Sequence, residues 1–211
     1  MTSIVVPSED LSRILWSALA FTPARSHYRF VRLSISMGWL EAMASDSYSI
    51  GSDSAPGMQH GDAAHIVIDA SEAKAAEQAI RAHDKCNVAV SFTDVPTQRV
   101  TFRVDDYNDG EVIAELTDLG SGEAEKLFKL CDSLLEKLDP LDFKVPNKLA
   151  LRASLLAPFL RLRFNGNAGD VLDFYVADPN EPILVRYGAT FVGAIMPIAR
   201  EEAPEGSLWQ E

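Results

Sequence analysis

Three stretches of the sequence carry apolar residues at the spacing of an amphipathic helix. The first has them at i, i+3, i+4, i+7 and i+8, which predicts a helix that buries this one face. The apolar residues of this face are Leu11, Ile14, Leu15, Ala18 and Leu19. The polar residues expected on the opposite, solvent-facing side are Glu9, Ser12, Arg13 and Ser17. Ser8 precedes the stretch and is the expected N-cap.

The second and third helices differ in the width of the face that they bury. The second is expected to begin at Ser71 as its cap, and its narrow face of small residues would let it lie close to a sheet. That face consists of Ala73, Ala76, Ala79 and Ile80. The third is predicted over residues 122–138, where apolar residues keep helical period over four turns until Pro140 ends the pattern. A shorter helix is expected over 148–157.

Alternating or β-branched runs between these helices predict strands. The strands are expected at residues 4–6, 28–36, 39–44, 65–68, 87–92, 99–104, 112–116, 160–164, 171–176, 183–187 and 191–198. Gly38 fits a tight turn between two of them, and the Asp- and Gly-rich residues 105–110 fit a hairpin turn. Residues 51–61 are rich in Gly, Ser, Asp and Pro, which predicts a loop.

The order of these elements repeats weakly along the chain, since strand, helix and several strands recur at an interval of roughly 100 residues. The pattern predicts an α+β fold with helices packed on antiparallel sheets. We expect one full repeat in residues 1–118, a reduced second repeat in 119–199, and an acidic tail in 200–211.

Composition and charge narrow the classes of function. The 211 residues carry 19 Lys and Arg against 31 Asp and Glu, a net charge of −12, which excludes a cationic binder of nucleic acid but not a single basic stripe. The two cysteines, Cys86 and Cys131, have no CxxC partner, so the sequence predicts neither a disulfide scaffold nor a zinc module and favours a cytoplasmic protein. We expect no membrane span and no signal peptide.

Four segments, in order, resemble the DNA polymerase processivity clamps, the sliding clamps of replication. Residues 39–50 (WLEAMASDSYSI) are similar to the family segment L-x-x-x-A-T-D-G-[YH]-R-L, with Ser47 and Ser49 where the family has Gly and Arg. Residues 66–73 resemble the strand that enters the second helix of a clamp domain, and 178–185 resemble the penultimate hairpin. Residues 191–198 (FVGAIMPI) resemble the closing strand with its M-P sequence. The resemblance is to a shortened clamp of bacterial or phage type.

This resemblance implies a homo-oligomer that encircles duplex DNA, holds it through helix-borne Lys and Arg without reading bases, and needs no cofactor or metal. The residues expected to face phosphates are Arg13, Lys74, Arg81, Lys126, Lys129, Lys137, Lys148 and Arg152. They are also explained as ordinary solvated helix positions beside acidic residues, and the sequence leaves both interpretations open. The resemblance predicts DNA contact if the set shares one face.

The resemblance also implies an apolar cleft that captures short peptides of polymerase and clamp-loader subunits. Carried over position by position, the cleft residues are Ser45, Ser47, Tyr48, Ile50, Leu127, Met196 and Pro197. Leu127 and Met196 are equally well explained as core residues. In the tail, Leu208 and Trp209 are flanked by acids and are candidates to dock in such a cleft, either in cis or on a neighbouring copy.

No motif in the sequence favours an enzyme. The four histidines lack metal-ligand spacing, and the chain has no P-loop, no G-x-G-x-x-G and no G-x-S-x-G. Asp105, Asp106, Asp109 and Glu111 lack the spacing of an EF-hand, and a hairpin turn explains them. Two alternatives to the clamp remain: an acidic interaction module that keeps the fold without a ring and regulates a replication complex, and a small-molecule enzyme of unrecognised type.

Overall fold

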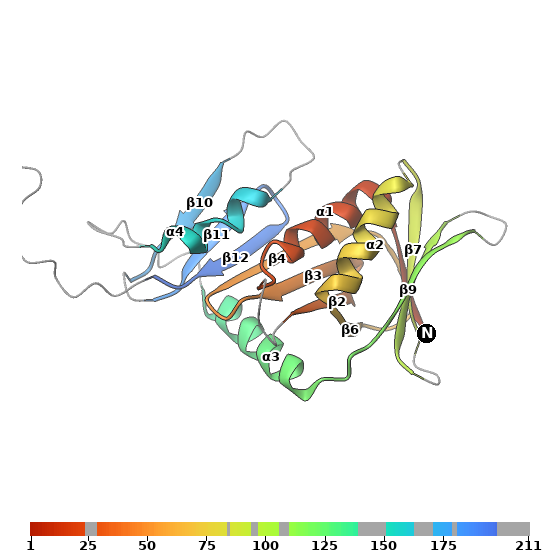
Figure 1. Ribbon diagram of the computed structural model, residues 1–211, viewed down its shortest axis with the longest axis horizontal. Coiled ribbons are helices and arrows are strands. Elements are labelled where there is room, and N and C mark those ends of the chain that lie inside the picture. The colour runs from red at the N-terminus through yellow and green to blue at the C-terminus, as the bar shows by residue number, and fades with distance from the viewer. Residues whose placement is uncertain are drawn as a thin grey trace, which may run out of the picture.

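The computed structural model describes residues 1–23, 29–83, 85–93, 97–105, 110–138, 151–162, 171–178 and 181–197. Their strands form two antiparallel sheets (Figure 1). The five-stranded sheet has the order β5-β1-β7-β8-β9, and the seven-stranded sheet has the order β10-β11-β12-β4-β3-β2-β6. The prediction of an α+β fold with helices on antiparallel sheets is confirmed.

The strands agree with most of the predicted runs. The five-stranded sheet contains β1 (Thr2–Pro7), β5 (Met58–His60), β7 (Asn87–Thr93), β8 (Arg99–Val104) and β9 (Val112–Thr117). The seven-stranded sheet contains β2 (Phe30–Ser36), β3 (Trp39–Ser45), β4 (Ser49–Pro56), β6 (Ala64–Asp69), β10 (Leu172–Tyr175), β11 (Ile183–Tyr187) and β12 (Phe191–Ile195). Because β12 pairs with β4, one sheet continues across the expected boundary between the two repeats.

The helices cover opposite faces of the seven-stranded sheet. Helices α1 (Ser8–Leu19) and α2 (Ala70–Ala82) pack against each other and contact strands of both sheets. Helix α3 (Gly122–Lys137) lies on the other side of β2, β3 and β4 (Figure 1). Successive side chains of a strand point to opposite faces of the sheet, so each strand contributes to the packing on both faces. In β3, Ala42 and Ala44 belong to the core beneath α1, whereas Met43 between them packs with α3. The short helices α4 (Ala153–Leu156) and η2 (Phe159–Arg161) add to the α1 side.

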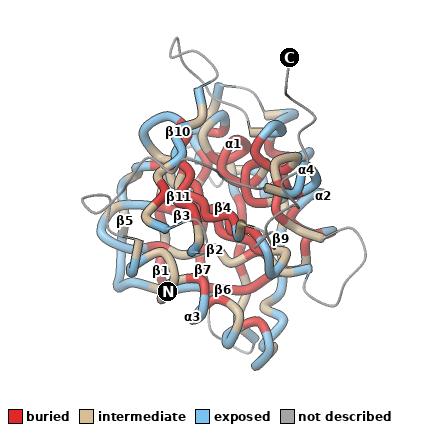
Figure 2. Tube along the Cα trace, turned by 90° about the vertical axis from the view of Figure 1, so that its left-hand side faces the viewer, coloured by how far each residue is buried: buried red, intermediate tan, exposed pale blue. Residues whose placement is uncertain are grey.

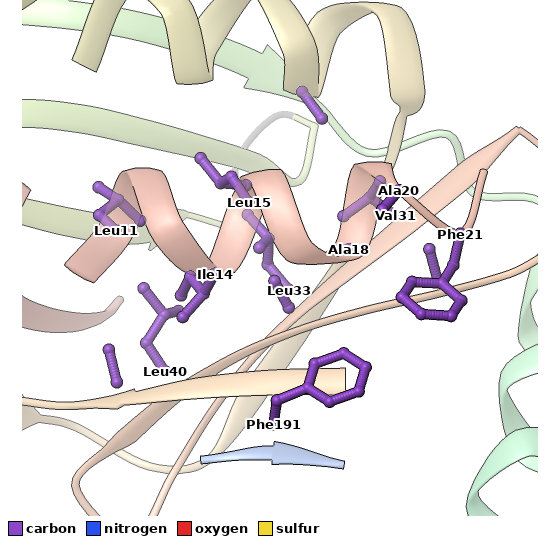
Figure 3. Close-up of a cluster of buried hydrophobic side chains, with 14 of the residues drawn as sticks. Leu11, Ile14, Leu15, Ala18, Ala20, Phe21, Val31, Leu33, Leu40 and Phe191 are labelled. Carbon is purple, nitrogen blue, oxygen red and sulfur yellow. The ribbon is translucent and has the colours of Figure 1, made fainter. Parts of the chain in front are cut away.

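The main core lies between α1, α2 and the two sheets, and the buried residues gather there (Figure 2). Leu11, Ile14 and Leu15 of α1 are fully buried, as their spacing predicts, and Ile14 lies beside Leu40 of β3 (Figure 3). An aromatic cluster closes the far end of this core. Its members are Phe21, Phe159 and Phe191, with ring centroids 4.8 to 6.2 Å apart.

The loop expected over 51–61 is wrong, because these residues belong largely to β4 and β5. The small residues that suggested a loop leave room for side chains that pack closely over β4. A Cβ on Gly51 would lie 2.2 Å from Cδ2 of Phe21, so the aromatic ring needs a glycine beneath it. Asp53 is buried and accepts a hydrogen bond from Ser17 at 2.9 Å. Buried polar partners on α1 therefore keep a polar segment inside the sheet.

The strand expected over 160–164 is also wrong in its described part, where η2 occupies Phe159–Arg161. Phe159 is buried in the aromatic cluster, and the indole Nε1 of Trp16 donates to the Arg161 carbonyl at 2.7 Å, so tertiary contacts hold a short helix here. The helix expected over 148–157 is shorter, with α4 beginning at Ala153; residues 148–150 lie outside the described residues.

Both expected helix caps are wrong. Ser8 is the first residue of α1, and its hydroxyl faces the amide of Cys86 at 3.4 Å instead of capping the helix. Asp69, not Ser71, caps α2, because its carboxylate accepts from the Ser71 amide at 2.7 Å. Ser71 is already inside the first turn of α2, and its hydroxyl donates to the Asp69 carboxylate.

The expectation that α1 turns its polar side to solvent is confirmed for Glu9, which is exposed, and is wrong for the other three residues. Ser12, Arg13 and Ser17 are buried, because α2, β4 and the β11–β12 turn cover that side. The Arg13 guanidinium forms a short ion pair with Asp53 and a hydrogen bond to the Thr190 hydroxyl at 3.1 Å. These polar contacts join α1 to the second part of the chain.

Candidate functional site

A hollow of about 460 Å³ opens on the α3 side of the seven-stranded sheet. Three segments that are distant in sequence surround it: the turn between β3 and β4, one side of α3, and the end of β12. We call this hollow the α3 groove. Its lining residues are Ser45, Ser47, Tyr48, Ile50, Glu123, Lys126, Leu127, Leu130, Cys131, Leu134, Pro182, Ala194, Ile195 and Met196.

The β3–β4 turn is held by its own side chains. The Asp46 carboxylate accepts from the amides of Tyr48 and Ser49 at 3.0 and 2.7 Å, and the Ser45 hydroxyl donates to the Ser49 carbonyl at 2.9 Å. Ser47 takes a positive φ of 74°, which lets the chain reverse within the turn. The turn therefore presents Tyr48, 61% exposed, as a fixed edge of the groove.

The end of β12 is tied to the same turn. The Met196 amide donates to the Tyr48 carbonyl at 2.9 Å, directly after the last ladder pair between Ile195 and Ser49. This hydrogen bond extends the pairing with β4 beyond the end of β12. It places the Met196 side chain, 38% exposed, in the groove wall. Two segments separated by 148 positions thus form one continuous rim.

The apolar residues of helix α3 form two rows, one in the core and one along the groove. Ala124, Phe128 and Cys131 are buried against the outer face of the sheet together with Met43 and Val67. A second row recurs at i, i+3 and i+7 and turns toward the groove, where it stays partly exposed. This row consists of Leu127, Leu130 and Leu134. The predicted helix is confirmed, but only part of its apolar surface is core.

An ion pair fixes α3 on the sheet. The Arg32 guanidinium of β2 donates to both carboxylate oxygens of Asp132 at 2.7 Å, and it lies 5.2 Å from the centre of the Phe128 ring. Burial disfavours the charged guanidinium, yet the hydrogen bonds and charge of Asp132 outweigh it, so the pKa of Arg32 lies above its ordinary value. The bidentate geometry restrains the helix more firmly than a single contact would.

The groove is apolar with few charges. Among the described residues that line it, only Glu123 and Lys126 are charged, and they have opposite signs. Burial raises the pKa of the Cys131 thiol to about 11, so that this residue is a neutral part of the floor at physiological pH. A surface of Leu, Ile and Met with a few hydroxyl groups at its edge suits large apolar side chains of an extended peptide.

The structure brings six of the seven predicted cleft residues together. Ser45, Ser47, Tyr48, Ile50, Leu127 and Met196 all line the groove, whereas Pro197 follows Met196 without lining it. Sequence reasoning missed Leu130 and Leu134, although their helical spacing from Leu127 could have identified them. It also missed Pro182, for which only the fold supplies the proximity.

The predicted basic residues do not share one wall. The prediction that Arg13 faces phosphates is wrong. Its side chain is buried and its guanidinium forms an ion pair with Asp53, because the sheet and not solvent lies over that side of α1. Lys74 and Arg81 are exposed on α2, and Arg152 is exposed before α4. Three more are exposed on α3, across the sheet from α2: Lys126, Lys129 and Lys137. Lys148 lies outside the described residues.

A smaller hollow of about 270 Å³ lies on the α1–α2 side. Arg29, Lys74 and Arg161 line it beside Trp16, and no carboxylate is among its described lining residues. Of these three cations, the sequence analysis identified only Lys74. The other two come from the start of β2 and from η2, so their proximity depends on the fold.

Within the described ranges, no group of three or more His, Cys, Asp or Glu side chains could hold a metal ion. No helix found in the same part of the chain is long and apolar enough to cross a membrane.

Solved structures of bacterial sliding clamps match this fold over nearly the whole chain. The DNA polymerase III beta subunit of Thermotoga maritima matches with a TM-score of 0.64 at 10% identity and covers 95% of the chain. The Bacillus subtilis sliding clamp matches with a TM-score of 0.63 at 12% identity and covers 94% of the chain. The Helicobacter pylori beta clamp, bound to a DNA ligase peptide, matches with a TM-score of 0.63 at 12% identity and covers 96% of the chain. The chain spans 66%, 64% and 67% of the length of these clamps, respectively.

The fold is therefore that of a sliding clamp in shortened form, and the predicted resemblance is confirmed at the level of the fold. No family model matches the sequence, and no curated protein matches it.

Proposed function

We propose that this protein is a clamp-like processivity factor, which tethers DNA polymerase and clamp-loader peptides through the α3 groove while it assembles around duplex DNA. The observation that carries the proposal is the groove itself. Three distant segments converge on it, and two of them, the β3–β4 turn and the end of β12, lie in segments whose sequence resembles the clamp family. Such a protein performs no bond chemistry, so we expect no catalytic activity.

The free edges of the sheets support a homo-oligomer. In the described part of the chain, β9 has only β8 as a neighbour and β10 has only β11. Each edge exposes a large apolar side chain, Val112 at 45% and Phe174 at 40%. Unpaired edges are templates for pairing with another chain. If β9 of one copy pairs with β10 of the next, the contact is head-to-tail, and such contacts close into a ring when the rotation between copies permits.

The DNA surface belongs on the α1–α2 side in this proposal. Lys74 and Arg81 of α2, together with Arg29 and Arg161, are exposed or line the smaller hollow there. Contacts of this kind neutralise phosphates without reading sequence, as sliding requires. The lysines of α3 would then face away from the DNA.

The decisive test combines mass with topology. We expect light scattering to give a small multiple of 23.1 kDa and the protein to stay on nicked circular DNA but leave after linearisation. The double variant Val112→Lys/Phe174→Lys should be monomeric and should not be retained. A monomeric wild-type protein without topological retention contradicts the ring.

The acidic interaction module is the second candidate, and one observation favours it. The predicted basic residues are divided between α2 and α3, and Arg13 is engaged inside the protein, so the positive surface is smaller than expected. This candidate predicts a monomer that still binds peptide. Fluorescence anisotropy with the DNA ligase peptide of the Helicobacter pylori complex measures groove binding under both candidates, because it does not depend on a ring.

A further inference from the structure

We infer that the segment following β12 regulates the α3 groove by occupying it in cis, with Leu208 and Trp209 as the inserted residues. The inference rests on the proposed function in one respect, that the groove accepts apolar peptide side chains. It adds an occupant from this chain itself. The protein would then compete with its own partners for one site.

Continuity of the chain provides the first argument. Met196 lines the groove and Pro197 is the last described residue, so residues 198–211 start at the groove rim. Leu208 is eleven positions beyond Pro197. A chain of that length spans up to about 36 Å when extended and about 18 Å on average when flexible. A site at its own starting point is within reach without any rearrangement of the fold.

The chemistry of the segment provides the second argument. From 201 onward the sequence is EEAPEGSLWQE, in which Leu208 and Trp209 are the only large apolar residues among four glutamates. The groove offers partly exposed apolar side chains from each of its walls, including Tyr48 at 61% and Leu130 at 58%. Inserting a leucine and an indole would remove those surfaces from water.

Charge does not select the occupant. Glu123 and Lys126 of the groove offset each other, so the glutamates of the segment gain little from entering it. Apolar contact therefore has to supply the affinity, and we expect occupancy to depend weakly on salt. Tethering favours binding in cis, because a short flexible connection gives an effective concentration on the order of millimolar.

The test uses the full chain with a labelled synthetic peptide of residues 201–211 as the probe. The double variant Leu208→Ala/Trp209→Ala should bind this peptide about tenfold more tightly than the wild-type chain, because the internal competitor is gone. Gln210→Ala, next to the inserted residues, is the matched control and should behave like wild type. Adding Leu130→Glu to the double variant should remove the peptide affinity. Leu130 is largely exposed, so this change leaves the fold intact.

A second measurement does not depend on the peptide. The emission of Trp209, obtained by subtracting the spectrum of Trp209→Phe from that of wild type, should lie to the blue of an exposed indole. It should shift to the red in Leu130→Glu.

Equal peptide affinity for the wild type and the double variant, or a solvent-like emission of Trp209, overturns the inference. A competition that strengthens with protein concentration would place the segment in a second copy and also overturns it. If the Helicobacter pylori ligase peptide binds while these effects are absent, only the inference fails. If neither peptide binds any variant, the proposed function of the groove fails.

Discussion

Arg13 of α1 and Asp53 of β4 form a buried ion pair, with side chains 7% and 2% exposed. Asp53 also accepts from the hydroxyls of Ser17 at 2.9 Å and Thr190 at 2.8 Å, so its charge is fully partnered. Thr190 lies in the turn between β11 and β12. One polar cluster therefore joins the first helix, the middle of the large sheet and the second part of the chain.

Asp53→Ala should lower the free energy of unfolding by about 3–5 kcal/mol, because it leaves the buried Arg13 guanidinium with Asp10 as its remaining carboxylate contact and removes the buried partner. The control is Asp10→Ala, which removes the half-exposed contact to Arg13 at 3.3 Å and should have an effect of about 0–1 kcal/mol. Urea unfolding followed by circular dichroism measures both. Similar losses for the two variants would show that the buried pair has no special role.

Leu130→Glu should reduce binding of the ligase peptide by more than tenfold, since it places a carboxylate in an apolar wall. The melting temperature should remain near that of wild type because the residue is 58% exposed. Met58→Glu, at an exposed apolar residue of β5 in the other sheet, is the matched control and should bind normally. Isothermal titration calorimetry provides the measurement. Unchanged affinity of Leu130→Glu would remove α3 from the binding surface.

Asp132→Ala should loosen α3 from the sheet. The change removes both hydrogen bonds to Arg32 and should decrease stability by about 1–2 kcal/mol, a value reduced by the partial exposure of Asp132. Amide hydrogen exchange should accelerate along α3 more than along α1. Glu136→Ala, at an exposed position of the same helix, should leave the exchange of α3 unchanged.

The cap of α2 predicts a dependence on pH. Although burial acts in the opposite direction, the hydrogen bonds from Ser71 hold the pKa of Asp69 below its ordinary value. The folded state therefore prefers the carboxylate, and the contribution is complete above about pH 4 and is lost as the pH falls through the lowered value. Asp69→Ala should decrease stability by about 1 kcal/mol at pH 7. The difference from wild type should shrink in unfolding experiments below pH 4; a constant difference would argue against the charged cap.

Charge reversal can identify the surface that meets DNA. Lys74→Glu/Arg81→Glu on α2 should weaken binding to duplex DNA and reduce the salt slope by about 2, because two phosphate contacts are lost. Lys129→Glu/Lys137→Glu makes the same change in charge on α3 and should have little effect. Equal losses for the two pairs would indicate that only the net charge matters.

The sequence alone was sufficient where an element is governed by local periodicity. The apolar faces of α1 and α3 and the alternation in β2 followed from spacing, because the apolar residues of each element recur on the side that packs into a core. The short segments around Ser45 and Met196 also identified the groove, since their order along the chain resembles a clamp.

The tertiary structure decided what depends on contacts between distant residues. Residues 51–56 form a strand because Phe21 lies on Gly51 and Arg13 neutralises Asp53, and neither partner is visible in the local composition. Residues 159–161 form a short helix because Phe159 enters an aromatic cluster with Phe21. The distribution of the basic residues over two faces of the molecule also depends on contacts between distant residues. Helical spacing gives the side of a helix on which a lysine lies, but only the packing of the helices on the sheet decides which of these sides face the same way.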